Sequence, residues 1–238
     1  MSVYSTEHRL GGNDVNMFRR LRTSVMFELM QDVSEQQNVL HGLDSASIRE
    51  RGLFWAVIRQ RAAVSRMPGY GERITLETWP GKPRHMLFPR YFRLLDSPGD
   101  VLVSVSSVWT LVDIESRKMV SPEKYGIQAA YEITGNELPL PRPPEPVRDG
   151  DEVLFTVPFS YADMNGHMNN TRYFDLAEDG SSAAAAGKQL SEILVEYSAE
   201  AHIGDEIVLC RSESEGRYTV SGSEDGRKLF TVSLRYRE

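Results

Sequence analysis

Leu138-Pro-Leu-Pro-Arg-Pro-Pro-Glu-Pro146 is the segment around which this chain is organised. Each proline fixes its own φ and removes a backbone donor, so five prolines in so short a run exclude a helix or a central strand. Proline-rich segments of this kind are extended, semi-rigid spacers. We therefore expect an N-terminal domain over residues 1–137, a linker over 138–149 and a C-terminal domain over 150–238.

The residues before the linker predict one long helix followed by several strands. Apolar side chains recur every three or four positions between Asn13 and Asn38, which is the helical period, and Gly42 supplies a stop signal. Four strand-like runs follow: Leu53–Ser65, Arg73–Trp79, Leu87–Leu95 and Val101–Asp113.

The residues after the linker repeat this order. A strand is predicted over Val153–Phe159 and a helix over Thr171–Ala186. Further strand-like runs follow: Glu192–Ala199, Glu206–Arg211, Arg217–Gly222 and Leu229–Tyr236. Tyr70–Glu77 also resembles Ile203–Cys210, because both place a glycine and an acid ahead of an alternating strand. We therefore expect an α+β fold of two related halves, each a curved antiparallel sheet around a central helix.

The bulk composition excludes several kinds of partner. A formal net charge of −7 over 238 residues argues against a nucleic-acid binder, which usually carries a basic face. Cys210 is the only cysteine, so the chain has neither an internal disulfide nor a cysteine-rich metal site. No run approaches the ~20 apolar residues that span a bilayer, and no signal-peptide core is visible. We expect a cytoplasmic protein that does not use a membrane.

The densest polar cluster is Ser160–Phe174, between a predicted strand and a predicted helix. Asp163, Asn165 and His167 alternate in it, and Gly166 allows the backbone to come close to a ligand. A carboxylate and a histidine are the usual proton carriers near neutral pH. Backbone N–H groups of Gly166 and His167 and the helix N-terminus could stabilise an oxyanion, which suits attack on a thioester. A solvated loop with an asparagine-rich helix cap is the structural alternative.

The run Asp163-Met-Asn-Gly-His-Met-Asn-Asn-Thr-Arg-Tyr173 resembles the signature of acyl-ACP thioesterases. This resemblance implies a double hotdog fold, hydrolysis of acyl groups from acyl carrier protein to end fatty acid synthesis, and no cofactor. Glu200 takes the place of a further family acid. Ala201 stands where plant members have a cysteine, which excludes a thiol mechanism at that position.

The resemblance makes Asp163, Asn165, His167 and Glu200 the candidate catalytic residues. Glu200, or the Asp163–His167 pair, would deprotonate a water that attacks the thioester carbonyl, and Asn165 would fix the water or a carboxylate. His167 would protonate the leaving thiolate. A covalent anhydride through a carboxylate stays open as an alternative.

The first half has no such cluster. Arg9–Met17 carries Asp14 and Asn16 without a following histidine, so we expect a half that lost catalysis and kept the fold. In the family that half forms much of the acyl pocket. The candidate pocket residues are Val25, Met26, Leu29, Met30 and Trp55, although such stripes are more often core.

The expected partner is an acidic acyl carrier protein that bears acyl-phosphopantetheine. Arg19, Arg20 and Arg22 cluster on the predicted first helix and are candidates for docking it, with ordinary solvated charge as the alternative. A double hotdog chain could be a monomer or a homodimer. The remaining histidines have no metal-ligand spacing, so no metal site is expected: His8, His41, His85 and His202.

Three other functions remain open. An acyl-CoA thioesterase would use the same chemistry with a different carrier. A hotdog hydratase resembles Asp-x-Asn-Pro-x-His, whereas no proline follows Asn165 here and His167 comes one residue too early. A non-catalytic acyl-thioester sensor would need an output module, for which the chain shows no spare segment.

Overall fold

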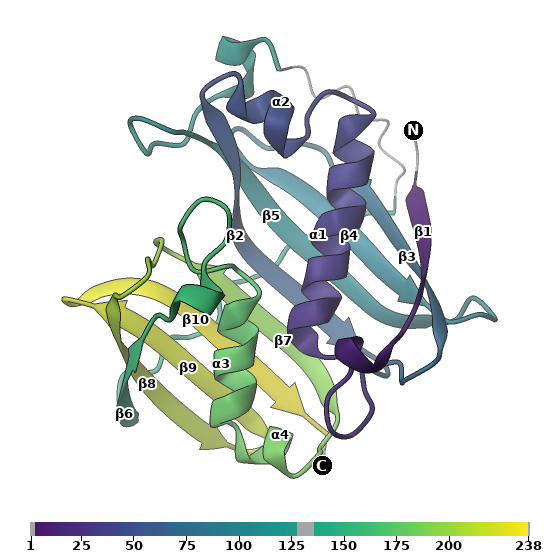
Figure 1. The fold of residues 1–238 in the computed structure, drawn as a ribbon, viewed down its shortest axis with the longest axis vertical. Coiled ribbons are helices and arrows are strands. Elements are labelled where there is room, and N and C mark those ends of the chain that lie inside the picture. The colour runs from purple at the N-terminus through teal and green to yellow at the C-terminus, as the bar shows by residue number, and fades with distance from the viewer. Residues whose placement is uncertain (1–2, 128–135, 238) are drawn as a thin grey trace.

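The computed structural model describes residues 3–127 and 136–237, and within them one antiparallel sheet dominates the fold. Its strands are paired in the order β1-β3-β4-β5-β2-β7-β10-β9-β8-β6 (Figure 1). Their bounds are β1 Tyr4–Arg9, β2 Leu53–Val64, β3 Arg73–Pro80, β4 Phe88–Leu95, β5 Val101–Asp113, β6 Asp151–Thr156, β7 Leu190–Tyr197, β8 Glu206–Ser214, β9 Arg217–Glu224 and β10 Arg227–Tyr236.

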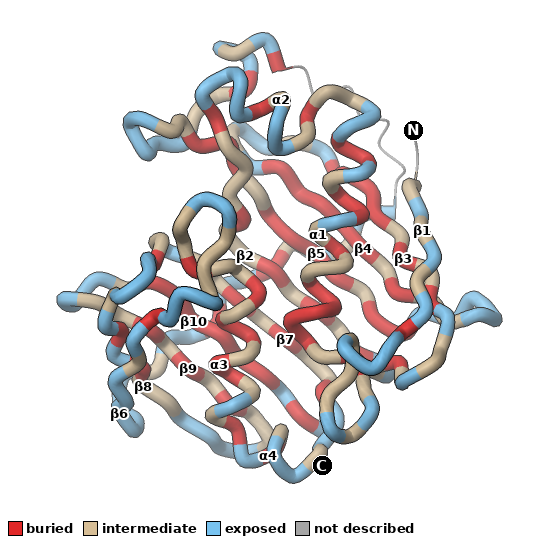
Figure 2. The backbone as a smooth tube through the Cα atoms, in the orientation of Figure 1, coloured by how far each residue is buried: buried red, intermediate tan, exposed pale blue. Residues whose placement is uncertain are grey.

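Two central helices lie on one face of this sheet, α1 (Thr23–Val39) over the first half and α3 (Arg172–Gly180) over the second (Figure 1). Their apolar sides meet in the stacked rings of Phe27 and Phe174, whose centroids lie 4.3 Å apart. Buried residues follow the sheet beneath both helices (Figure 2). The shorter helical elements are α2 Ser45–Arg49, α4 Ser182–Ala185, and the 3-10 turns η1 Gly12–Asp14, η2 Pro122–Tyr125 and η3 Phe159–Tyr161. No described helix has the length and apolar character required to cross a membrane.

The sheet consists of two copies of one strand order. β1-β3-β4-β5-β2 in the first half corresponds to β6-β8-β9-β10-β7 in the second, and β2 pairs with β7 at the centre. Two ion pairs cross this seam, Arg59 with Glu196 at 3.0 Å and Arg61 with Glu192 at 2.9 Å. The predicted α+β fold of two related halves is confirmed.

The helix boundaries differ from the sequence prediction. The first half opens with β1, and α1 begins at Thr23 because η1 and a loop occupy the preceding residues. The second predicted helix breaks at Ser181, whose extended backbone ends α3 and whose side chain caps α4. Ala183 is buried, whereas Ala185 and Ala186, at the end of the predicted second helix, are exposed. The expected linker, residues 138–149, forms no helix or strand.

Candidate active site

Asp163 organises the loop between η3 and α3. Its Oδ1 accepts hydrogen bonds from the backbone N–H of Asn165 at 2.8 Å and of His167 at 3.2 Å. The Asp163 carbonyl accepts a third from Gly166 N–H at 3.0 Å. Gly166 adopts a φ of 80°, which a side chain would disfavour, so the glycine is required by this tight turn. The loop thus holds three alternating polar side chains in fixed positions.

The predicted oxyanion site at the backbone of Gly166 and His167 is wrong for this geometry. Both N–H groups already donate within the loop, to the carbonyl and to the carboxylate of Asp163. A donor engaged in such a turn is not free to stabilise a developing charge. Asp163 accepts these hydrogen bonds from its own loop, and the spacing of the residue types in the sequence did not predict them.

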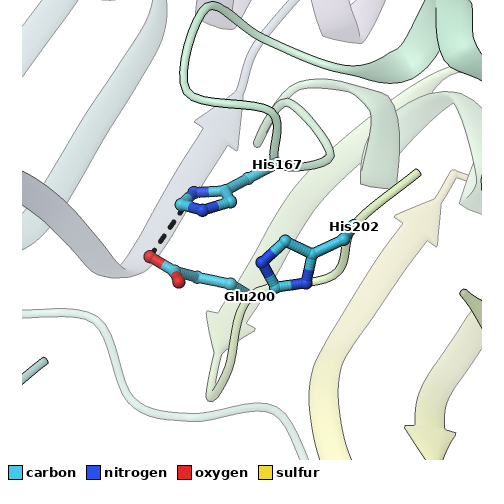
Figure 3. A group of neighbouring side chains, drawn as sticks. All are labelled: His167, Glu200 and His202. Atoms are coloured by element: carbon cyan, nitrogen blue, oxygen red, sulfur yellow. Dashed lines mark ion pairs between the residues drawn. The ribbon is translucent and has the colours of Figure 1, made fainter.

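His167 and Glu200 meet, as predicted. The His167 Nδ1 atom lies 3.5 Å from the Glu200 Oε1 atom, and the two side chains are 15% and 35% exposed. Figure 3 shows them pointing toward each other, with the ring of His202 beside them. A backbone bridge between His167 and His202, and a 2.7 Å hydrogen bond from Met168 N–H to the Ala201 carbonyl, hold the two segments in register. A carboxylate at Nδ1 favours the tautomer in which Nε2 can accept a proton.

Two arginines of the first half reach this site, one through Glu200 and one through Asn165, and neither was predicted from the sequence. Arg117, in the turn after β5, places Nη1 3.2 Å and 3.1 Å from the two carboxylate oxygens of Glu200. Arg49, the last residue of α2, donates from Nη1 to Asn165 Oδ1 at 3.0 Å. No sequence pattern distinguishes these two arginines from other surface arginines, because their contacts form only when the two halves of the fold pack side by side.

Tyr173, the second residue of α3, is buried. Burial raises its pKa well above the usual value, and the negative charges of Glu200 and Asp163 raise it further. Tyr173 packs edge-to-face against Tyr197, which donates to the Asn170 carbonyl at 2.9 Å. Tyr173 therefore stays protonated and supports the start of α3.

A cavity of about 570 Å³ opens beside the loop. Its wall includes Asp163, Asn165 and Trp55, whereas His167 and Glu200 are not among the residues that line it. Polar residues of α1, residues of α2 and mostly apolar residues of β3–β5 and the loops between them form the remainder, with three more residues of the loop: Gln31, Asp32, Ser34, Glu35, Asn38, Ser45, Ala46, Pro80, Gly81, Pro83, Phe88, Pro89, Arg90, Trp109, Met164, Asn169 and Asn170.

Only one of the five predicted acyl-contact residues lines this cavity. Trp55 does, whereas Val25, Met26 and Met30 are buried in the main core and Leu29 packs against it. The physical reason is the rotation of α1: its apolar stripe faces the sheet, and its polar side faces the cavity. The methionine and valine stripe is therefore core.

The first half contains a second copy of the loop that carries Asp163 and His167. Asn16 Oδ1 accepts from Phe18 N–H at 3.0 Å and from Arg20 N–H at 3.2 Å. Arg20 is bridged to Gly69 in the way that His167 is bridged to His202. This register pairs Asn16 with Asp163 and Arg20 with His167. The expected correspondence of Asp14 and Asn16 with Asp163 and Asn165 is therefore wrong by two residues.

Acyl-ACP thioesterase models match both halves of the chain, the N-terminal domain over residues 1–127 and the C-terminal domain over residues 145–232. The chain belongs to the acyl-ACP thioesterase family. In sequence it is similar to acyl-[acyl-carrier-protein] hydrolase FATB2 of Cuphea viscosissima, with 26% identity over 161 residues. That alignment spans 63% of this chain and only 39% of the plant protein.

Solved members of the family share the double hotdog fold with this chain. An acyl-ACP thioesterase from Bacteroides thetaiotaomicron has a TM-score of 0.86 at 20% identity, with 99% of this chain and 98% of that one covered. The 12:0-ACP thioesterase from Umbellularia californica has a TM-score of 0.79 at 18% identity, with 99% and 97% covered. At these identities the likeness establishes the fold.

The arginines that were expected to dock a carrier lie outside α1, contrary to the sequence prediction. Arg19 sits in the turn with a φ of 61° and places its guanidinium over the Tyr70 ring. Arg20 donates to the Gly187 carbonyl at 2.7 Å, and Arg22 donates to the Asn13 carbonyl. Arg20 and Arg22 line a second cavity between the first-half loop and α3. Their side chains support the local structure there, and carrier docking by them stays a prediction.

Proposed function

We propose that this member of the family hydrolyses the thioester of an acyl group carried on acyl carrier protein, releasing a free fatty acid and the carrier thiol. The observation that supports this most directly is the His167–Glu200 pair beside a loop whose Asp163 and Asn165 line a large cavity. An acyl chain in the cavity would bring its carbonyl to the loop, with the carrier arm on the solvent side.

In the proposed reaction, Glu200 holds the Nδ1–H of His167, and Nε2 takes a proton from water. The water oxygen bonds to the carbonyl carbon, and the negative charge moves to the carbonyl oxygen. When the carbon–sulfur bond breaks, the same proton passes from His167 to the leaving thiolate. The reaction thus consumes one water and needs no redox partner.

Asn165 is the candidate donor to the oxyanion. Arg49 occupies its Oδ1, which fixes the amide orientation and leaves the Nδ2 hydrogens to face the cavity that Asn165 lines. A side-chain amide held in this way can stabilise an oxyanion by about 3–4 kcal/mol. In this proposal the Asn165 amide takes the oxyanion role that was expected of the backbone N–H groups of Gly166 and His167, which donate within the loop.

The competing route is an anhydride between the acyl group and a protein carboxylate. Single-turnover reactions in H₂¹⁸O separate direct water attack from an anhydride that water opens at its enzyme carbonyl. Water attack places ¹⁸O in the fatty acid and none in the protein. An anhydride opened by water at its enzyme carbonyl would instead place ¹⁸O in the Asp163 or Glu200 peptide, and mass spectrometry of the digested protein would detect it.

The function itself is tested by measuring free thiol from matched acyl-ACP and acyl-CoA substrates of several chain lengths. We expect faster turnover of acyl-ACP, with loss of at least about 10²-fold in kcat for His167→Ala and Glu200→Gln. His85→Ala, an exposed histidine on another loop, is the matched control. Equal or better turnover of acyl-CoA would favour the CoA thioesterase, and binding without thiol release would favour the acyl sensor.

Carrier docking has its own test on the same substrates. An acidic carrier would be attracted by basic groups, for which we retain Arg19, Arg20 and Arg22 as candidates and add Arg49 and Arg117 beside the loop. Neutralising a docking arginine raises KM for acyl-ACP and leaves KM for acyl-CoA unchanged. An equal rise for both substrates would exclude that arginine from docking.

A further inference from the structure

We propose that His167, Glu200 and His202 form a binding site for a divalent transition-metal ion such as Zn²⁺, and that the bound ion blocks hydrolysis. The second part rests on the proposed function, whereas the metal site itself does not. Among the described residues, these three side chains offer ligand atoms that all lie within 4.8 Å of one another. Figure 3 shows them converging from two neighbouring segments.

The donor set suits zinc. Two imidazoles and one carboxylate, completed by a water, form a common four-coordinate zinc site with ligand bonds of about 2.0–2.2 Å. Neighbouring donors in such a site lie about 3.4 Å apart, so these side chains need to move inward by only about 1 Å. The His167 and His202 rings are 4.9 Å apart at 89°, and their backbones are bridged, so the scaffold for this movement is fixed.

His202 has the supporting contact that metal-binding histidines usually have. Its Nδ1 lies 3.5 Å from Asp205 Oδ2, and its backbone N–H donates to the same oxygen at 2.7 Å. A carboxylate at one ring nitrogen orients the imidazole and leaves the other nitrogen for the metal. The His202 side chain is 53% exposed, so an ion can arrive directly from solvent.

Arg117 competes with the metal for Glu200. Its guanidinium lies 3.1 Å from Glu200 Oε2 and must leave before a cation can bind there. Because this pair is solvent-exposed, at 52% and 35%, its separation costs little. A metal held by Glu200 and His167 would also occupy the carboxylate and the imidazole that the proposed reaction uses, so metal binding and catalysis exclude each other.

The repeat in the fold predicts one metal per chain. In the first-half copy of the loop, Arg20 stands in place of His167 and Gly69 in place of His202. Leu21 N–H donates to the Pro68 carbonyl as Met168 N–H does to that of Ala201, which puts Met67 in place of Glu200. None of these three residues offers the imidazole or carboxylate that His167, Glu200 and His202 offer in the second half.

Calorimetric titration of the metal-free protein with Zn²⁺ alone tests the site without any substrate. We expect a 1:1 complex, about 100-fold weaker in His202→Ala and about 10-fold weaker in Asp205→Asn. Arg117→Gln should bind more tightly than the wild type, and His85→Ala should match it. Absence of binding to the wild type, or equal affinity in His202→Ala, would overturn the proposed site.

Hydrolysis of acyl-ACP at increasing Zn²⁺ tests the block, with each variant compared with its own metal-free rate. We expect half-inhibition of the wild type at the calorimetric dissociation constant and a parallel shift in His202→Ala. Binding without inhibition would refute the block and keep the site. If the metal-free enzyme releases no thiol, the proposed function fails and the calorimetric result still decides the metal site.

Discussion

Asn16 and Asp163 occupy the same position in two copies of one loop, and each accepts backbone hydrogen bonds from the residues two and four places ahead of it. An uncharged amide is therefore sufficient to hold the loop. The carboxylate stands in the copy that also carries His167 and Glu200, which supports the proposal that its charge serves the reaction rather than the fold.

Asp163→Asn should therefore fold normally and lose activity. The amide oxygen can accept the same two hydrogen bonds, so we expect an unchanged melting temperature. Loss of the negative charge at the cavity wall should lower kcat by about 10²-fold or more. Thermal unfolding and steady-state kinetics measure the two effects separately. Near-normal turnover in a folded variant would remove Asp163 from the mechanism.

Arg117→Gln should lower kcat for acyl-ACP in metal-free buffer, because Glu200 would lose the group that fixes both of its oxygens. A misplaced catalytic group costs up to about 10²-fold. Lysine keeps the charge without the two-pronged contact, so Arg117→Lys should recover part of the loss. The free energy of unfolding should change by less than about 1 kcal/mol, because the pair is exposed. A kcat unaffected by Arg117→Gln would contradict the positioning role.

Arg49→Gln should lower kcat by about tenfold, because the Asn165 amide would lose the contact that orients it. Arg51, an exposed neighbour, provides the control of equal charge. Comparing kcat of Arg49→Gln and Arg51→Gln on one acyl-ACP separates orientation of Asn165 from a general charge effect. Equal rates in the two variants would argue against Arg49.

Glu178 makes stability depend on pH. Burial raises its pKa to about 7, although a hydrogen bond from Thr23 opposes the rise. Between pH 4.5 and 7 the folded state holds a proton that the unfolded state has lost, so the free energy of unfolding falls as pH rises. Glu178→Gln should remove this slope and stabilise the protein above pH 7 by about 1–3 kcal/mol. Urea unfolding at pH 5 and 8 measures this change, and Glu152→Gln, at an exposed position, is the control. An equal change in the free energy of unfolding between the two pH values in the wild type and in Glu178→Gln would contradict the prediction.

The stacked pair between α1 and α3 should dominate the stability of the helix layer. Phe27 and Phe174 have no exposed surface, so Phe174→Ala removes a buried ring and should cost about 3–5 kcal/mol. Phe159, which is 82% exposed, is the matched control, and its alanine variant should change stability by less than about 0.5 kcal/mol. Similar losses in both variants, measured by urea unfolding, would count against this interpretation.

Much of the fold was predictable because strand and helix periods are local signals. The two halves, the runs of strands that follow the central helix of each half and the equivalence of Tyr70–Glu77 with Ile203–Cys210 were predicted from patterns in the sequence. Gly71 and Gly204 mark equivalent turns with positive φ in these two segments. The order in which the strands pair was not predicted, because it depends on contacts between distant segments. The start of α1 was missed because residues 13–22 continue an apolar period that backbone hydrogen bonds of the loop interrupt.

The site was predictable only in part. Asp163, Asn165 and His167 lie within one short run, and the resemblance to the family added Glu200. Arg49, Arg117 and His202 escaped because their roles depend on contacts between distant segments. The facing direction of α1 also depends on packing, so the helical period alone could not separate core residues from cavity residues.

The central β2–β7 pairing joins two halves of the sheet, and each half carries one copy of the loop. The two copies are encoded by different stretches of one gene. In an assembly of two identical subunits, any codon change would alter both copies of the loop at once. Here a codon change alters one copy of the loop alone. Directed evolution can therefore reshape the first-half loop, which carries Arg20, for a new ligand while the second-half loop keeps His167.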